Sequence, residues 1–244
     1  MSIEQTMKKL YEMRLGSMAE AYEEQRKDPG YINLDFDDRL AQLVDRHWLK
    51  QTNKAIERRL RSAKLRQNAS VESIDYHTRR GLNKNMFQEL TKLEWIRYRQ
   101  NCVITGPTGV GKSYLTCALG QKACREGYKA LYKQSMKLFR ELLAAKADGS
   151  LTKMLIKIAK HDLLIIDDFG LESARKGQYR DFLELVDEMW NNGAIIIATQ
   201  FPVDKWHDFI DEPTVADAIV DRVFHNAYFV NLKGESMRKI KVKS

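Results

Sequence analysis

The chain has 244 residues, of which 43% are hydrophobic and 30% are charged, a composition typical of a globular protein with its own core. Its net charge of +8 suits a nucleic-acid partner, although the placement of charges matters more than their sum. The amino terminus has no signal-peptide core, and no apolar run approaches the roughly 18 residues that a membrane span needs. We therefore expect a cytoplasmic protein with no membrane partner. Cys102, Cys117 and Cys124 lack metal-ligand spacing, which predicts buried, reduced thiols.

The first third of the chain is predicted to be helical. Two short helices are expected at residues 2–14 and 17–27. A long helix follows from Asp35 to Arg66, because no Gly or Pro interrupts that run. Residues recurring every four positions give it one mostly apolar stripe. The stripe consists of Phe36, Leu40, Val44, Trp48, Thr52, Ile56 and Leu60.

The same long helix is strongly basic. Between Arg39 and Arg66 it carries nine Lys or Arg residues against two acids, a net charge of +7. Ordinary i,i+4 pairing would mix the signs, so we expect contacts with DNA phosphates and not with base edges. A solvated helix face is the alternative. The predicted contacts are Arg58, Arg59, Arg61, Lys64 and Arg66, and residues 1–68 are assigned to a helical domain for DNA binding and assembly.

A different pattern begins at Asn101, after a polar break at 67–76 and a further predicted helix at 83–99. Short aliphatic runs then alternate with helices that begin near residues 112, 135, 177 and 214. The predicted strands are "NCVITG", "KALYK", "LLIID", "AIIIATQ" and "AYFVNL". Such alternation predicts an α/β fold with a parallel sheet covered by helices on both faces. Residues 69–244 are therefore assigned to one ATPase domain.

The stretch "GPTGVGKS" fits the phosphate-binding pattern G-x-x-x-x-G-K-[ST] between a strand and a helix. Its glycines let backbone N–H groups face the phosphates of ATP, and the helix N-terminus favours an anion. Lys112 is expected to reach the β- and γ-phosphates, and Ser113 to ligate Mg²⁺. The predicted nucleotide contacts are Gly106, Pro107, Thr108, Gly109, Val110, Gly111, Lys112, Ser113 and Tyr114.

Two adjacent acids end the strand "LLIIDDFG". A buried carboxylate needs a cation, and we expect Asp167 to meet the Mg²⁺ that Ser113 also holds. Asp168 is predicted to orient or deprotonate the attacking water. The alternative is an acid that only tunes the metal.

Three later polar residues complete the predicted site. Gln200 ends the strand "AIIIATQ", where a ligand of a parallel sheet is expected, although a strand-end cap is the alternative. Arg222 is predicted to complete a neighbouring subunit's site as an arginine finger. Its alternative is an internal pair with Asp217 or Asp221. Arg238 is predicted either to reach the nucleotide or to remain a surface charge.

Together with "ATQFPVDKWHDFIDEP", "DAIVDR" and "LKGESMRK", these motifs resemble the IstB family of transposition helper ATPases, which is related to DnaC-type helicase loaders. The resemblance covers residues 85–244 closely. It implies an AAA+ fold that assembles with ATP on duplex DNA, with little sequence preference, and cooperates with an IstA-type transposase. It assigns Lys112 and Ser113 to Walker A, Asp167 and Asp168 to Walker B, Gln200 to sensor 1, Arg222 to the arginine finger and Arg238 to a sensor-2-like arginine.

Two departures from the family pattern qualify these expectations. Asp168 stands where many AAA+ proteins have the longer Glu, which predicts slow hydrolysis, and Gln200 replaces the commoner Asn. A DnaC-type helicase loader is the alternative within the same machinery. A small-molecule P-loop kinase, or a DNA-binding protein that uses ATP only as structural glue, are the alternatives from other classes.

Overall fold

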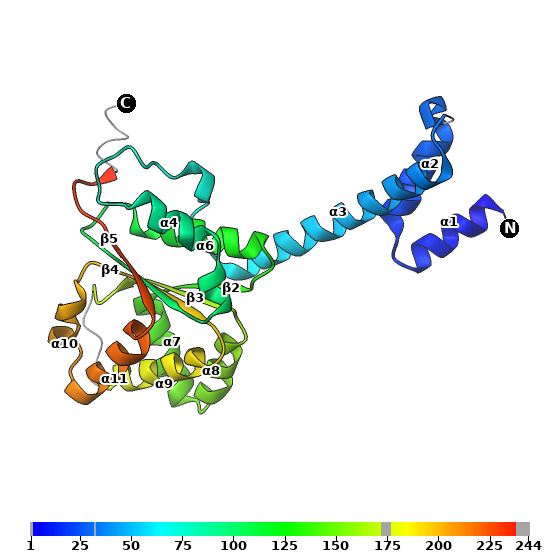
Figure 1. Ribbon diagram of the computed structural model, residues 1–244. Helices are drawn as coiled ribbons and strands as arrows, with labels where there is room; N and C mark the ends of the chain where they lie inside the picture. Colours follow the sequence, from blue (N-terminus) through cyan, green and yellow to red (C-terminus); the bar gives the residue numbers. More distant parts are fainter. Residues whose placement is uncertain (1, 32, 172–176, 238–244) are drawn as a thin grey trace. The chain divides into compact units, whose positions relative to one another are not determined.

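The computed structural model describes residues 2–31, 33–171 and 177–237, and they group into two compact units (Figure 1). The units are Met1–Arg58 and Arg59–Ser244. The domain boundary predicted after residue 68 therefore lies inside the second unit. Arg238 lies outside the described residues, so its role stays a prediction.

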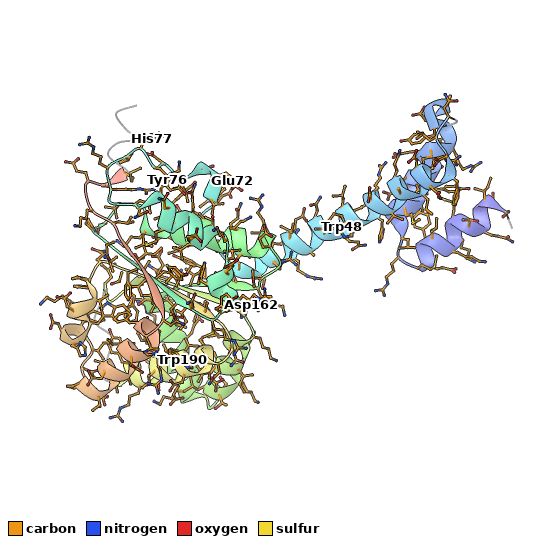
Figure 2. All side chains as sticks on the ribbon, viewed as in Figure 1. Trp48, Glu72, Tyr76, His77, Asp162 and Trp190 are labelled. Atoms are coloured by element: carbon orange, nitrogen blue, oxygen red, sulfur yellow. The ribbon has the colours of Figure 1, made fainter. Side chains whose placement is uncertain are left out.

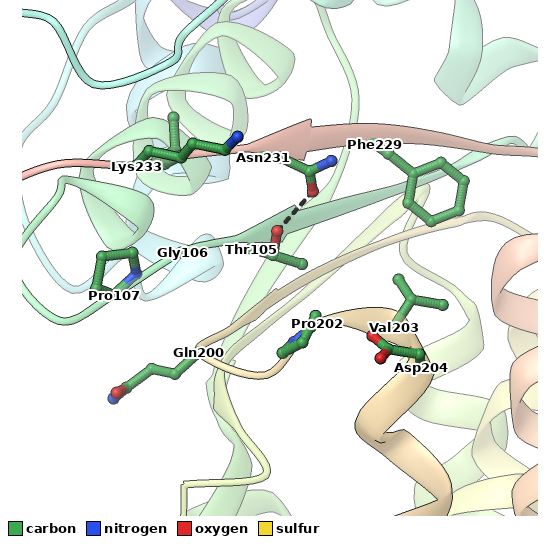
Figure 3. A pocket seen from close by; sticks show the side chains of 11 residues that line it. Thr105, Gly106, Pro107, Gln200, Pro202, Val203, Asp204, Phe229, Asn231 and Lys233 are labelled. Carbon is green, nitrogen blue, oxygen red and sulfur yellow. Dashed lines mark hydrogen bonds between the residues drawn. The ribbon is translucent and has the colours of Figure 1, made fainter.

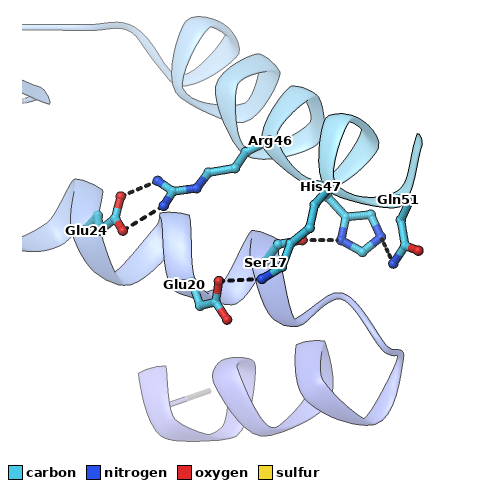
Figure 4. Close-up of polar contacts among 7 residues, drawn as sticks. Ser17, Glu20, Glu24, Arg46, His47 and Gln51 are labelled. Atoms are coloured by element: carbon cyan, nitrogen blue, oxygen red, sulfur yellow. Dashed lines mark hydrogen bonds and ion pairs between the residues drawn. The ribbon is translucent and has the colours of Figure 1, made fainter. Parts of the chain in front are cut away.

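The first unit is helical. Its elements are α1 (Ile3–Glu12), α2 (Gly16–Lys27), the 3₁₀ turn η1 (Pro29–Tyr31) and most of α3 (Phe36–Ala63), which continues into the second unit. The three predicted helices are confirmed to within three residues at each end. Helices α2 and α3 are joined by Arg46 with Glu24 and by Ser17 Oγ, 2.8 Å from His47 Nδ1 (Figure 4).

The stripe predicted on α3 divides into two parts. Phe36 is 72% exposed and Trp48 is 61% exposed (Figure 2), so the amino-terminal part of the stripe lies on the surface. Farther along, Leu60 packs against the core of the second unit and Ala63 is fully buried there. The apolar period therefore predicted the helix, while burial follows it only near the carboxyl end.

The second unit is built on a five-stranded parallel sheet with strand order β2-β3-β4-β1-β5. The strands are β1 (Asn101–Thr105), β2 (Ala130–Gln134), β3 (Leu163–Phe169), β4 (Ala194–Thr199) and β5 (Ala227–Asn231). All five predicted strands are confirmed. Their central residues are aliphatic because both faces of the sheet are covered.

Successive strand residues enter two separate cores, because side chains alternate across a strand. Cys102 and Ile104 pack with α4 (Lys84–Thr91) and α6 (Lys112–Arg125), whereas Val103 packs on the other side of the sheet. Figure 1 shows these two helices on one face of the sheet and a second group of helices on the other. The second group comprises α7 (Ser135–Ala147), α8 (Leu151–Ala159), α9 (Gln178–Trp190) and α11 (Pro213–Phe224).

The helical segment predicted at 83–99 is confirmed, but it is divided. It consists of two helices, α4 and the short α5 (Glu94–Arg97), separated by Leu93 in a left-handed conformation with φ of 62°. Leu93 is 2% exposed, and Trp95 Nε1 donates a 2.8 Å hydrogen bond to the Leu90 carbonyl. Burial of two large side chains therefore overrides helix continuity. Helix α8, α10 (Trp206–Phe209) and the turns η2 (Val71–Ser73) and η3 (Val203–Lys205) were not predicted.

All three cysteines are free and buried, as the sequence predicts, and burial alone raises the pKa of the Cys102 thiol to about 12. In the part of the chain that the structure describes, no helix combines the length and the apolar character that crossing a membrane requires.

Candidate nucleotide-binding site

The loop from Gly106 to Ser113 joins β1 to α6 at the carboxyl edge of the sheet. Three glycines give it its shape, with φ of 146° at Gly106, 85° at Gly109 and 100° at Gly111. Such values favour glycine because a side chain is strained there. Lys112 opens α6, so the loop leads directly into a helix N-terminus, where anions are favoured.

The segment that follows β5 packs closely on this loop. A Cβ at Gly106 would lie 2.6 Å from the Leu232 carbonyl oxygen, and one at Gly109 would lie 2.1 Å from Ser236 Oγ. The Met237 N–H donates a 2.9 Å hydrogen bond to the Gly109 carbonyl. The glycines are therefore required by close packing as well as by backbone conformation.

Lys112 is 7% exposed, and its ammonium group lies against its own loop. Nζ donates to the carbonyls of Gly106 at 2.6 Å and Pro107 at 2.9 Å. Burial lowers the pKa of Lys112, and the nearby carboxylates of Asp167 and Asp168 oppose that shift. No carboxylate among the described residues pairs directly with Nζ, so this buried cation is well suited to an anionic ligand.

The two acids of β3 occupy different surroundings. Asp167 is fully buried, and its Oδ2 accepts a 2.7 Å hydrogen bond from the Tyr132 hydroxyl. Burial and this hydrogen bond raise the pKa of Tyr132, which keeps the hydroxyl protonated as a donor. Asp168 is partly exposed and accepts hydrogen bonds from Arg66 Nη1 at 3.0 Å and Gln134 Nε2 at 3.2 Å.

A β-bulge separates the two carboxylates. Ile166 is in register with Ile197 and Phe169 with Thr199, so two residues of β3 oppose one residue of β4. Asp168 adopts φ of 58°, and its N–H donates to its neighbour's Oδ1 at 2.9 Å. The bulge explains how consecutive acids both reach the carboxyl edge of the sheet, where alternation alone would send them to opposite faces.

Gln200 follows β4 and meets the phosphate-binding loop. Its Oε1 accepts a 2.9 Å hydrogen bond from Thr108 Oγ1. Thr199 is fully buried, and its hydroxyl donates to the Phe169 carbonyl at 2.8 Å. Thr199 therefore ties β4 to β3, while Gln200 is the residue that faces the loop.

A cavity of about 560 Å³ lies beside the start of the loop (Figure 3). Its polar wall includes Thr105, whose Oγ1 lies 2.6 Å from Asn231 Oδ1. Its lining comprises Thr105, Gly106, Pro107, Gln200, Pro202, Val203, Asp204, Phe229, Asn231, Leu232 and Lys233. The first residues of the loop, Gly106 and Pro107, therefore line this cavity together with Gln200.

Arg222 has an internal partner, but not either of the two considered from the sequence. It pairs with Asp187 of α9, and its Nη1 donates to the Ala218 carbonyl at 3.2 Å. Asp217 instead lies 2.8 Å from His207. Helices α9 and α11 share one core, which brings Asp187 to the arginine.

The predicted DNA contacts do not all face solvent. Arg58, Arg61, Lys64 and Arg66 are exposed, as a phosphate contact requires, and Arg59 is partly buried. Arg59 Nε, however, donates a 2.7 Å hydrogen bond to the Cys124 carbonyl, and Arg66 pairs with the acids of β3.

Several polar residues of this site were missed by sequence reasoning. Tyr132 and Gln134 lie at the end of β2, and their position at the carboxyl end of a parallel strand was a usable signal. Arg80 gave no such signal. It is 3% exposed and donates 3.0 Å hydrogen bonds to the carbonyls of Val110 and Asp75. It thereby braces the phosphate-binding loop from behind.

These residues fit a nucleoside triphosphate with Mg²⁺. Lys112 supplies a buried cation at a helix N-terminus, and Ser113 and Asp167 supply oxygen ligands of the kind Mg²⁺ prefers. The described residues contain no group of three or more His, Cys, Asp or Glu side chains that could hold a metal alone.

Comparison with known proteins points the same way. Residues 8–244 match the family model described as IstB-like ATP binding protein. The chain is 40% identical over 234 residues to the "Putative insertion sequence ATP-binding protein y4pL" of Sinorhizobium fredii, covering 96% of each chain.

Among solved structures, the chain is similar to DnaI with a TM-score of 0.56 and 21% identity, covering 72% of this chain and 93% of that one. It is also similar to the DnaC helicase loader with a TM-score of 0.54 and 20% identity, covering 70% of this chain and all of that one. At these identities the likeness concerns the fold, which is that of an AAA+ P-loop protein.

Proposed function

The chain belongs to the family of IstB-like ATP-binding proteins, and on that premise we propose that it is an ATPase that assembles on duplex DNA. In this proposal it binds DNA with little sequence preference and assists an IstA-type transposase in moving an insertion sequence. The relative in Sinorhizobium fredii is named for an insertion sequence, which supports the setting.

The observation that carries the proposal is the meeting of three elements at one edge of the sheet. The phosphate-binding loop presents Lys112, β3 presents Asp167 and Asp168, and the end of β4 presents Gln200 against Thr108. A loop that only binds nucleotide does not need the second acid or the polar strand end. Their convergence favours hydrolysis of ATP.

Each side chain then has one task. Lys112 would exchange its loop carbonyls for phosphate oxygens, and Ser113 and Asp167 would hold Mg²⁺. The chemistry that Mg²⁺ would supply there is neutralisation of charge on the phosphates. Asp168 orients the attacking water and accepts its proton, as an acid within hydrogen-bond reach can. Gln200 contacts the γ-phosphate or the water from the end of β4.

We expect hydrolysis to be slow for two reasons. Asp168 is one methylene shorter than the Glu that many AAA+ proteins carry, so its carboxylate reaches less far. Its Oδ2 is also engaged by Arg66 and Gln134, and these donors must leave before that oxygen can accept a hydrogen bond from water. Turnover should therefore depend on assembly and on DNA.

The assembly is proposed to complete the site. Arg222 is 34% exposed and held by Asp187 on the surface formed by α9 and α11. An arginine supplied in trans would stabilise charge on the transferring phosphate. If Arg222 left Asp187 for a phosphate of the nucleotide bound to the neighbouring subunit, it would complete that subunit's site.

A helicase loader of the DnaC type remains the second candidate, because the DnaI and DnaC structures share this fold. The exposed basic residues Arg58, Arg61 and Lys64 favour a nucleic-acid surface. A kinase that acts on a small molecule would not need such a surface. The two DNA-linked candidates differ in their preferred DNA form.

The test measures assembly and turnover together. We expect size-exclusion chromatography with light scattering to show a larger species with ATP and duplex DNA than with either alone. ATP turnover should rise with duplex DNA more than with single-stranded DNA, and Lys112→Ala should abolish both effects. A protein that stays monomeric under every condition would refute the assembly, and stronger stimulation by single strands would favour the loader.

The DNA surface is tested by reversing the charges of the exposed residues Arg58, Arg61 and Lys64. We expect the triple variant to lose affinity about equally for all duplex sequences, because phosphate contacts carry no base information. Wild-type binding should weaken steeply with salt, owing to counterion release. Unchanged affinity of the triple variant would place the duplex elsewhere.

A further inference from the structure

The geometry points to Arg66 as a positioning residue that couples DNA binding to the ATPase site. In the free protein its guanidinium holds the carboxylate of Asp168, and we infer that duplex DNA draws the guanidinium away and releases this acid. The inference rests on the proposed function and names how that site is regulated.

Arg66 lies between the two acids of β3. Its Nη1 is 3.0 Å from Asp168 Oδ2 and 3.5 Å from Asp167 Oδ2. The side chain of Arg66 is 46% exposed, that of Asp168 is 22% exposed and that of Asp167 is fully buried. One face of the guanidinium thus meets the acids while the rest of it reaches solvent.

The fold places Arg66 there by a sharp end to α3. The helix ends at the buried Ala63, and Lys64 turns the chain with φ of 53°. Leu65 then packs over Gly120 of α6, where a Cβ would lie 2.9 Å from Leu65 Cδ2. The backbone is therefore fixed, and only the side chain is free to change partners.

The pairing matters for chemistry because Asp168 is predicted to act on the attacking water. With Arg66 and Gln134 both bound to Oδ2, that oxygen is occupied by protein donors and is closed to a water molecule. Mg²⁺ and Arg66 are also both attracted to the same pair of acids. Removal of the guanidinium should therefore favour metal binding and leave Oδ2 of Asp168 open to the attacking water.

DNA is the ligand that the surroundings of Arg66 fit. Arg66 ends the run Arg59–Arg66, which contains the exposed Arg61 and Lys64. An ion pair that is half exposed to water is weak, so phosphates gathered by the run can replace a carboxylate as the partner of Arg66. When Arg66 Nη1 turns to a DNA phosphate, it no longer holds Asp168.

The experiment compares Arg66→Gln with Arg66→Lys and with a matched control. Arg125→Gln serves as the control, because Arg125 pairs with Glu72 at 2.9 Å, is 44% exposed, and lies away from the acids of β3. Each Gln variant removes one positive charge, and the two arginine side chains are exposed to a similar extent. Thermal unfolding establishes that each variant is folded.

We expect Arg66→Gln to raise DNA-free ATP turnover by up to about fivefold, the rate equivalent of one exposed ion pair, and to reduce the stimulation by saturating duplex DNA by a similar factor. Arg66→Lys, which keeps the charge, should stay near wild type, and Arg125→Gln should match wild type. Equal loss of basal and stimulated turnover in Arg66→Gln would mean a merely structural role and overturn the inference.

A second readout needs neither hydrolysis nor DNA. Binding of a fluorescent ADP analogue is titrated with Mg²⁺, and Arg66→Gln should reach half-maximal Mg²⁺-dependent binding at a lower Mg²⁺ concentration than wild type. An unchanged midpoint contradicts competition between Arg66 and the metal. If duplex DNA does not change wild-type turnover, the proposed function is contradicted. The Mg²⁺ titration then still tests the role of Arg66.

Discussion

Asn101 provides the sharpest test of how the second unit is held together. It is the first residue of β1 and is 6% exposed. Its Nδ2 donates 3.1 Å hydrogen bonds to the carbonyls of Arg222 and Val223 at the end of α11. Its Oδ1 accepts a 2.9 Å hydrogen bond from the N–H of Ile195 in β4. One side chain therefore joins β1, β4 and α11.

We predict that Asn101→Ala lowers the free energy of unfolding by about 4–6 kcal/mol. Three hydrogen bonds contribute about 1 kcal/mol each, and a buried N–H left without a partner adds about 1–3 kcal/mol of desolvation. Two of the lost bonds end on carbonyls at or next to Arg222, so the same change should also loosen the end of α11. The binding of nucleotide by Lys112 should change little, because Asn101 is at the opposite end of β1.

The assay is urea unfolding followed by circular dichroism, with Asn192→Ala as the control. Asn192 also donates to a carbonyl near a helix end, that of Glu188 at 2.7 Å, but it is exposed. We expect its substitution to cost less than about 1 kcal/mol. If both variants lose the same small amount, with unchanged m-values, then Asn101 does not join the three elements and the reasoning fails.

Four further substitutions test the site. Lys112→Ala should remove nucleotide binding, measured by titration with a fluorescent analogue. Asp168→Asn should keep binding but trap the ATP-bound assembly, seen as a large species that persists in light scattering. Arg222→Ala should lower turnover about 10³-fold, as for known trans arginines, without changing the affinity of the monomer for nucleotide. If mixing the Arg222→Ala protein with the Lys112→Ala protein restores turnover, that result supports a role of Arg222 in trans. Gly106→Ala should destabilise the fold by about 2 kcal/mol or more in urea unfolding, because its Cβ would lie 2.6 Å from the Leu232 carbonyl.

The sequence by itself determined the local features of this protein. The five strands and the helices that follow them were predictable because each carries its own period of apolar residues. The phosphate-binding loop was predictable because its chemistry requires glycines, Lys112 and Ser113 within one short stretch. The two acids of β3 belong to this class as well, since they follow directly on a buried strand.

The break of the predicted helix at Leu93 required tertiary information. Nothing in the local sequence forbids a helix through this residue, and helical propensity is only a weak preference. The burial of Leu93 and Trp95 in the core decides the turn. The exposure of Phe36 and Trp48 is of the same kind, because an apolar stripe predicts a helix and not the element that covers it.

The partners of the charged residues were decided only by the tertiary structure. Arg66 and Asp168 are 102 residues apart in the chain, and Arg222 selects Asp187 because α9 and α11 share a core. Helical spacing can propose partners within a few residues, as it did with Asp217 and Asp221, since these lie on the same helix. Contacts between elements depend on strand order and helix packing, which no local pattern encodes. The sequence thus determined which residues carry the chemistry, and the fold decided which of them face one another.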